Sequence, residues 1–552
     1  MTRSLLIVPA IAALGLGACA GGADNGSAAA AGASAPLAPL LENIGDLHRE
    51  VSTDSERAQA FFDQGLRMAY AFNHAESLRS FRESARLDDD LALAYWGEAL
   101  SLGPNLNEAM PPERAPEAYA AVQEALERVA GASERERALV EALATRYSNR
   151  PDADRQALDR AYADAMGAVW DRWPDDPDIG ALYADALMNT GPWDYWEADD
   201  TPRPHAARAI EVLEQVIAAY PEHPGALHLH IHAIEASDHP ERALESADRL
   251  GRLMPAAGHI VHMPSHIYYR VGQYREATEA NLDAIAADED YLTQCQAQGL
   301  YPSEYYPHNV HFLYFATMME GRSHLAIESA RKVAAQAAKG HMHVFLSMQE
   351  LASTPYYALA RFGRWDEILA EPEPHHGAFQ RAMWHYARGL AFARTGNVEA
   401  GAGELARLEA LEDDPSLAEM LVGFDPGSVP LGIAAATLEG ELAARRGDVE
   451  AALQALETAV ASQDRLVYNE PESFYYPVRH SLGAVLLEAG RPAEAEAVYR
   501  RSLETHPENG WSLLGLEQSL LAQQKTAEAD TVHARFVRAW DRADVTPPAS
   551  RF

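Results

Sequence analysis

Histidines recur in this chain at a spacing of 34 residues. His228 and His232 are each followed 34 residues later by another histidine, His262 and His266 respectively. A period of this length is typical of repeats in which two helices are joined by a tight turn. Such a unit is amphipathic and cannot bury its apolar face alone, so successive units must stack against one another. The spacing therefore predicts an extended array of helix pairs.

A second echo spans 49 residues, from His259 to His308 and from His262 to His311. This distance equals one period plus an insertion of 15 residues, which we place at 292–306. A long loop in a repeat array commonly covers the functional face. Its Cys295 and Tyr305 are therefore candidates for an additional metal ligand or an outer-sphere partner. The alternative is that the loop only fills an irregular junction between repeats.

The unit beginning at residue 476 carries the clearest motif. Small or aromatic residues stand at its positions 8, 20, 24, 27 and 32, namely Gly483, Ala495, Tyr499, Ser502 and Pro507. This pattern resembles the tetratricopeptide repeat, in which small residues let paired helices approach closely and a proline ends the second helix. The same frame fits units that begin at residues 224, 258, 307, 349, 382 and 433, and more degenerate copies extend it over roughly residues 55–543.

The resemblance implies an all-α fold of helix-turn-helix repeats stacked into a right-handed superhelical solenoid with a concave groove. We expect three segments of repeats. Degenerate copies occupy residues 46–222, the His-rich copies occupy 223–345, and the C-terminal copies occupy 346–552.

The charge balance limits the partners. The chain of 552 residues has 82 acidic and 45 basic side chains, a formal net charge of −37. Binding of nucleic acid requires surfaces rich in Lys and Arg, so no nucleic-acid partner is expected. A hydrophobic content of 47% is incompatible with wholesale disorder.

The first residues predict export. Arg3 precedes a short apolar run, Leu5 to Leu16, so residues 1–18 are expected to be a signal peptide. The sequence Leu16-Gly17-Ala18-Cys19 resembles the lipobox of bacterial lipoproteins, which implies acylation of Cys19 and a membrane anchor. Ala20 after the cysteine implies sorting to the periplasmic face of the outer membrane. Residues 19–45 predict a flexible tether because they are rich in Ala, Gly, Ser and Pro.

The repeat frame places the histidines on one face. In tetratricopeptide proteins, positions 2, 5, 9 and 12 of the first helix usually face the groove, and at 100° per residue they form one stripe. In three consecutive repeats these positions hold Glu235 and seven histidines: His228, His232, His259, His262, His266, His308 and His311. By contrast, His230 is expected in the core or on the convex face, while His74, His239 and His324 are expected to be structural.

A transition-metal site is the chemistry that this pattern favours. Two histidines four residues apart on a helix can chelate one ion, and adjacent packed helices lie about 8–10 Å apart. A nitrogen-only ligand set suits copper or zinc, with iron competitive if Glu235 joins it. Asp178 and Asp185, on the preceding first helix, are candidates for extra ligands or for partners that orient the rings.

Two functions remain open from the sequence. The first is an exported lipoprotein that binds one or more Cu or Zn ions, a metal-dependent enzyme if a coordination position stays open. The second is a scaffold that binds protein or peptide partners in its groove without metal. The repeat does not separate them, because a fold does not fix a function, and no substrate or reaction class is predicted.

Overall fold

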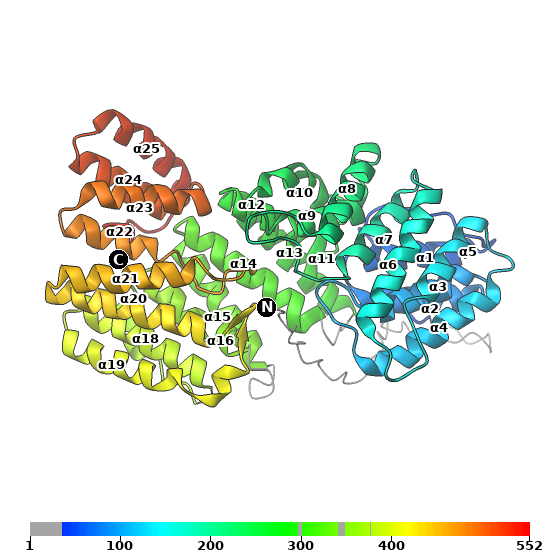
Figure 1. Ribbon diagram of the computed structural model, residues 1–552, viewed down its shortest axis with the longest axis horizontal. Coiled ribbons are helices and arrows are strands. Elements are labelled where there is room, and N and C mark those ends of the chain that lie inside the picture. Colours follow the sequence, from blue (N-terminus) through cyan, green and yellow to red (C-terminus); the bar gives the residue numbers. More distant parts are fainter. Residues whose placement is uncertain (1–35, 296–300, 340–347, 376) are drawn as a thin grey trace, which may run out of the picture. The chain divides into compact units, whose positions relative to one another are not determined.

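The computed structural model describes residues 36–295, 301–339, 348–375 and 377–552 (Figure 1). The predicted signal peptide, the predicted acylation site Cys19 and the first part of the predicted tether lie outside these residues, as does the side chain of Cys295. The chain forms two compact units. The first comprises residues up to Ile267 and Asp283–Pro302, and the second comprises Tyr268–Leu282 and Ser303–Phe552.

The first unit is built from short helices in consecutive pairs. In chain order they are α1 (Glu56–Tyr70), α2 (His74–Leu87), α3 (Ala92–Leu102), η1 (Pro112–Arg114), α4 (Ala115–Arg128), α5 (Glu134–Ala144), α6 (Arg155–Arg172), α7 (Pro177–Met188), α8 (Pro204–Ala219), α9 (Pro224–Ile234), η2 (Pro240–Ala243), α10 (Leu244–Leu250) and α11 (Gly258–His262). Helices α12 (Pro264–Arg270) and α13 (Tyr274–Cys295) contribute residues to both units, and η3 (Tyr301–Tyr305) follows.

The second unit continues in the same manner. Its elements are α14 (Tyr306–Met319), α15 (Ser323–Lys339), α16 (Met348–Arg361), α17 (Trp365–Ala370), α18 (Ala378–Arg394), α19 (Val398–Glu412), η4 (Pro415–Ala418), β1 (Leu421–Val422), β2 (Asp425–Pro426), α20 (Ser428–Arg446), α21 (Val449–Gln463), α22 (Arg479–Glu488), α23 (Pro492–Thr505), α24 (Gly510–Ala522) and α25 (Thr526–Ala539). The two strands form a small antiparallel hairpin.

Turn chemistry sets where the helices begin and end. The side chain of Asn73 caps α2 by accepting a hydrogen bond from the backbone N–H of Glu76, and Asp448 caps α21 in the same way at Ala451. Helix α20 ends at Gly447, whose φ of 79° is in the left-handed region that glycine adopts without a Cβ penalty. Many consecutive helices pack on one another, among them α1 on α2, α2 on α3, α20 on α21 and α24 on α25.

Aromatic rings of second helices occupy the space that glycines leave on first helices. A Cβ added at Gly65 or at Gly97 would lie within 2.8 Å of the Phe81 ring. In the C-terminal repeats, Gly483 and Gly515 approach the Tyr499 ring equally closely. These contacts are the physical reason for the small and aromatic residues of the repeat motif, and with the helix pairing they confirm the predicted all-α class of stacked helix-turn-helix repeats.

Two local expectations need correction. The predicted flexible tether ends before residue 45, because Leu37 N–H donates to Glu83 and Leu41 N–H donates to Gln64 Oε1 (2.8 Å), which fixes this segment on the first unit. The expected loop at 292–306 is partly helical, since α13 extends to Cys295 and residues 301–305 form a π-helical turn. The two units also divide the predicted His-rich segment 223–345 between them.

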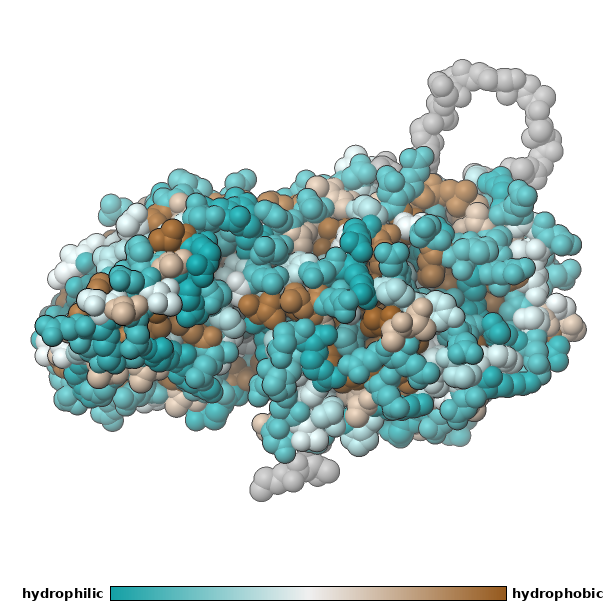
Figure 2. Space-filling model, turned by 90° about the horizontal axis from the view of Figure 1, so that it is seen from above, coloured by the Kyte–Doolittle hydropathy of each residue, from teal (hydrophilic) through white to brown (hydrophobic). Residues whose placement is uncertain are grey.

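Hydrophilic residues predominate on the face seen in Figure 2, where hydrophobic residues occur in small groups. This agrees with the strongly negative net charge. Among the residues that the structure describes, no helix combines the length and the apolar character needed to cross a membrane.

A buried ion network stabilises the second unit. Glu441 on α20 accepts from Nη2 of Arg394 (2.8 Å) and also pairs with Arg551, and all three side chains are at most 7% exposed. Burial opposes ionisation of Glu441, but the two guanidinium groups hold its pKa below the usual range. Burial lowers the pKa of Arg394 to about 10.

We expect Glu441→Gln to destabilise the second unit by on the order of 3 kcal/mol at neutral pH, since it leaves buried guanidinium charge uncompensated. A carboxylate with a lowered pKa contributes stability above its unfolded pKa and loses it as the pH falls through the folded value. The difference between the variant and the wild type should therefore shrink in acid. Urea unfolding of the variant and the wild type at pH 7 and at pH 4 measures the destabilisation and its decrease in acid. An equal free-energy difference at the two pH values would contradict the assignment of Glu441 as an ionised, charge-paired carboxylate.

Candidate metal centre

Five of the seven predicted histidines lie together in the first unit. They are carried by α9, α11 and α12, and all are at most 2% exposed: His228, His232, His259, His262 and His266. Their rings form a closed circle of neighbours. The ring centroids are 4.8 Å apart for 228–232, 5.9 Å for 232–266, 4.6 Å for 266–262, 6.1 Å for 262–259 and 4.9 Å for 259–228. The five histidines of the first unit that the repeat pattern assigned to one face therefore lie together in the structure.

The backbone fixes the ring of His228. Its Nδ1 donates to the carbonyl oxygen of Tyr70 (2.7 Å), at the end of α1. Nε2 then carries the lone pair, and this buried atom has no hydrogen-bond partner among the described residues. Burial, followed by the nearby His232, holds the pKa of His228 well below its usual value. The ring is therefore neutral, the form that binds a metal.

Glu235 orients two more rings. Its Oε1 lies 2.7 Å from Nδ1 of His232 and its Oε2 lies 2.6 Å from Nδ1 of His266. A carboxylate that accepts from both Nδ1–H groups leaves both Nε2 atoms as electron-pair donors. Of the two roles predicted for Glu235, this contact is that of an outer-sphere partner that orients ligands.

Two groups of nitrogen atoms converge. One ligand atom from each of His228, His232 and His259 lies within 4.8 Å of the others. Nitrogens that share an ion at about 2.0–2.1 Å are about 3.3 Å apart in a tetrahedral site, so no pair of these nitrogens needs to approach by more than about 1.5 Å to share an ion. In the second group, Nε2 of His262 already lies 2.7 Å from Nε2 of His266.

Aromatic side chains cover the three-histidine group. The Phe72 ring lies 4.4 Å from His228, 5.8 Å from His232 and 5.6 Å from His259, while Trp193 meets His232 edge-on at 5.6 Å. Phe72 has a φ of 55°, in the left-handed region that bulky residues rarely adopt. The sequence reasoning missed both residues. Phe72 belongs to the turn after α1, which reaches the site because α1 packs on α9.

A hydrogen-bond network around Asp178 holds Tyr70, the last residue of α1, next to the turn that carries Phe72. The Tyr70 hydroxyl donates to Oδ1 of Asp178 (2.8 Å), which also lies 3.1 Å from Nε2 of His223, and Nη1 of Arg49 donates to Oδ2 (3.1 Å). Burial opposes the charge of Asp178, but His223 and Arg49 hold its pKa below the usual range. Asp178 therefore supports the residue whose carbonyl orients His228, which is an indirect role and not that of a ligand.

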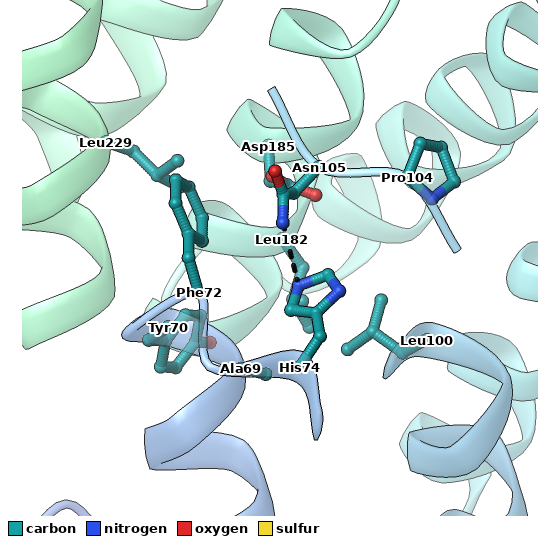
Figure 3. Close-up of a pocket in the computed structure, with 10 residues that line it drawn as sticks. All are labelled: Ala69, Tyr70, Phe72, His74, Leu100, Pro104, Asn105, Leu182, Asp185 and Leu229. Carbon is teal, nitrogen blue, oxygen red and sulfur yellow. Dashed lines mark hydrogen bonds between the residues drawn. The ribbon is translucent and has the colours of Figure 1, made fainter. Parts of the chain in front are cut away.

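A small cavity of about 30 Å³ lies next to Phe72 (Figure 3). Phe72 forms part of its wall, and its polar groups include His74, Asn105 and Asp185. The Asn105 amide nitrogen points at Nε2 of His74 (3.4 Å), as the dashed line in Figure 3 shows. Burial raises the pKa of Asp185 to about 6 and lowers that of His74 to about 4. Asp185 thus faces this cavity, where it accepts from Asn189.

The remaining candidates lie in the second unit. The ring of His308 lies 5.3 Å from Phe312, and Nε2 of His311 lies 3.8 Å from a carboxylate oxygen of Glu350. Tyr305 is buried. Within that unit these residues do not form a group like the five imidazoles of the first unit, and their role as ligands stays a prediction.

The histidines set aside by the repeat frame have other contacts. His230 is buried with Nδ1 2.9 Å from the Ser246 hydroxyl, and the side chain of His239 is 64% exposed beside Glu241. The backbone N–H of His324 donates to Asp544. His230 therefore differs from its neighbours on α9, which makes it a natural control.

No known family model matches the chain, and no curated protein matches it. Among solved structures, it is similar to the Cut9–Hcn1 hetero-tetramer of the APC/C, with 12% identity over 89% of this chain and 77% of that chain and a TM-score of 0.28. It is also similar to the human IFIT1 dimer with m7Gppp-AAAA, with 12% identity over 88% of this chain and 91% of that chain and a TM-score of 0.30.

We expect Gly225→Ala to disturb the site through Tyr70. A Cβ at Gly225 would lie 2.4 Å from Cδ1 of that ring, so the variant must push α1 away from α9, at a cost on the order of 2 kcal/mol. Gly432→Ala is the control, because that helical glycine faces open space and alanine there favours the helix by up to about 1 kcal/mol. Thermal unfolding compares the two, and equal midpoints would contradict the close contact.

Proposed function

We propose that this protein binds transition-metal ions, copper or zinc, through the histidines of α9, α11 and α12. The three-histidine group His228, His232 and His259 is the centre of the proposal. Three nitrogen ligands leave a fourth coordination position for water or a small molecule, as in catalytic metal sites. The proposal names no reaction, because no substrate or general base is assigned.

The observation that carries the proposal is the preset orientation of buried imidazoles. Nδ1 of His228 and of His232 are both engaged by oxygen acceptors, so the Nε2 atoms face inward as donors of electron pairs. Metal-binding histidines typically have their second ring nitrogen held in this way. Burying these imidazoles beneath Phe72 costs hydration, which coordination to a bound cation offsets.

The ligand set favours copper or zinc. Glu235 uses both of its oxygens to orient histidines, so it leaves an all-nitrogen set in the first unit. Nitrogen ligands suit Cu, Zn and Ni, whereas iron sites commonly add a carboxylate.

Burial counts against a peptide-binding role for these histidines. A groove that recognises a peptide through imidazoles must expose them, but all five are at most 2% exposed and Phe72 covers three of them. Protein or peptide partners on other surfaces of the repeats stay compatible with the fold.

Metal analysis tests the proposal. Protein purified without chelator from metal-replete cells should contain at least one equivalent of copper or zinc by elemental analysis. His228→Ala and His259→Ala should each lower the affinity of the three-histidine centre by at least about 100-fold. His230→Ala, on the same helix as His228 but directed at Ser246, should keep the metal. Wild-type protein without metal would refute the proposal.

We also propose that the protein is exported and anchored by a lipid on Cys19, as the motif Leu16-Gly17-Ala18-Cys19 indicates. An acyl anchor adds about 0.8 kcal/mol of membrane affinity per buried CH₂ group. Cys19→Ala should therefore move the protein from the membrane fraction to the soluble fraction. Unchanged fractionation, or failure to incorporate labelled fatty acid in the wild type, would contradict the anchor.

A further inference from the structure

We infer that the five imidazoles hold two metal ions in adjacent positions and that Glu235 links the two positions. This inference rests on the proposed metal-binding function and specifies its stoichiometry. The first ion would bind to His228, His232 and His259, and the second to the pair His262 and His266. Both would be nitrogen-preferring ions, copper or zinc.

The arrangement of the rings separates two groups. His228 lies between its partners, with ring centroids 4.8 Å from His232 and 4.9 Å from His259. The rings of His262 and His266 are 4.6 Å apart, and the steps from one group to the other are 5.9 Å and 6.1 Å. His232 and His259 are themselves 6.1 Å apart, so it is the central ring of His228 that joins them into one group. Structural zinc sites bind four ligands and catalytic sites bind three plus a solvent molecule, so five facing imidazoles exceed what one ion takes.

The pair on α11 and α12 is already close to chelating geometry. Two nitrogens bound to one ion at about 2.0–2.1 Å lie about 2.8–3.4 Å apart, and the two Nε2 atoms are 2.7 Å apart. Because Nδ1 of His266 donates to Glu235, its Nε2 carries a lone pair. Nδ1 of His262 lies 3.3 Å from the Ser265 hydroxyl, which can donate to it or accept from it. With this lone pair, Nε2 of His266 accepts a hydrogen bond from Nε2–H of His262, and Nδ1 of His262 then accepts from the Ser265 hydroxyl. A cation between the two rings would take the place of this proton, with His262 in the Nδ1–H tautomer and donating to Ser265.

Glu235 connects the two groups through one carboxylate. One oxygen orients His232 of the first group and the other orients His266 of the second, at 2.7 and 2.6 Å. Glu235 is completely buried, so its charge is not screened by water and compensates cationic charge on either side. As a positioning residue it should therefore influence both ions, unlike any single ligand.

The experiment is a stoichiometric titration of the full chain, stripped of metal, with Zn²⁺ against a competing chelator. Wild-type protein should bind two equivalents in the first unit's site. His228→Ala and His262→Asn should each lose one equivalent and keep the other. Glu235→Gln should weaken both by about 10–100-fold, because its NH₂ group meets a ring N–H where the carboxylate accepted one.

The matched control is Glu404→Gln. In the second unit, Oε2 of Glu404 accepts from Nδ1 of His385 at 2.6 Å, the same pairing without a histidine cluster around it. This variant should bind zinc as the wild type does, and circular dichroism should show every variant folded. His266→Gln provides a second substitution in the pair should His262→Asn not fold.

The outcomes separate the inference from the function on which it rests. No zinc binding by the wild type refutes the proposed function. One equivalent that is lost in both His228→Ala and His262→Asn shows a single shared ion and overturns the inference alone. If Glu235→Gln weakens zinc binding at only one of the two positions, Glu235 does not link them.

Discussion

The close packing of α1 on α9 is the contact on which the site depends. Gly225, at the start of α9, leaves the space in which the Tyr70 ring lies, and the 154 residues between Tyr70 and Gly225 fold so that these two helices meet. The Tyr70 carbonyl then orients His228, and Phe72 closes over three imidazoles. A contact between helices so distant in sequence carries a large loop-closure entropy, which the packing of every helix pair between them offsets.

The sequence predicted the histidines of this site, but not the aromatic residues that cover them. A 34-residue period is a strictly local signal, and it placed His228, His232, His262 and His266 on one stripe because helical geometry repeats with the chain. Phe72 and Trp193 carry no such periodicity. Their positions follow from a non-local helix contact and from the irregular segment at 192–203, where a bridge joins Trp196 to Pro202. The expected open groove is for this reason a closed cluster.

Three buried carboxylates of the first unit have different roles because their neighbours differ. Asp178 is surrounded by donors, Arg49, Tyr70 and His223, so its charge is fixed and its role is to hold a turn. Glu235 accepts hydrogen bonds from two imidazoles, and its charge becomes useful when a cation is near. Asp185, whose pKa burial raises to about 6, faces a cavity. The type of residue was predictable from the repeat frame, but only the neighbours decide which of these roles it has.

The position of the Phe72 ring over the three histidines has a kinetic consequence. Its ring closes one side of the three-histidine group and its turn is held between α1 and α2, so water and chelators reach those nitrogens on this side only when the turn opens. Opening of a buried turn is a local unfolding event with its own free energy. Through this side, an ion held beneath the ring would leave no faster than the turn opens. Its residence time would then be set by loop opening and not by bond strength alone.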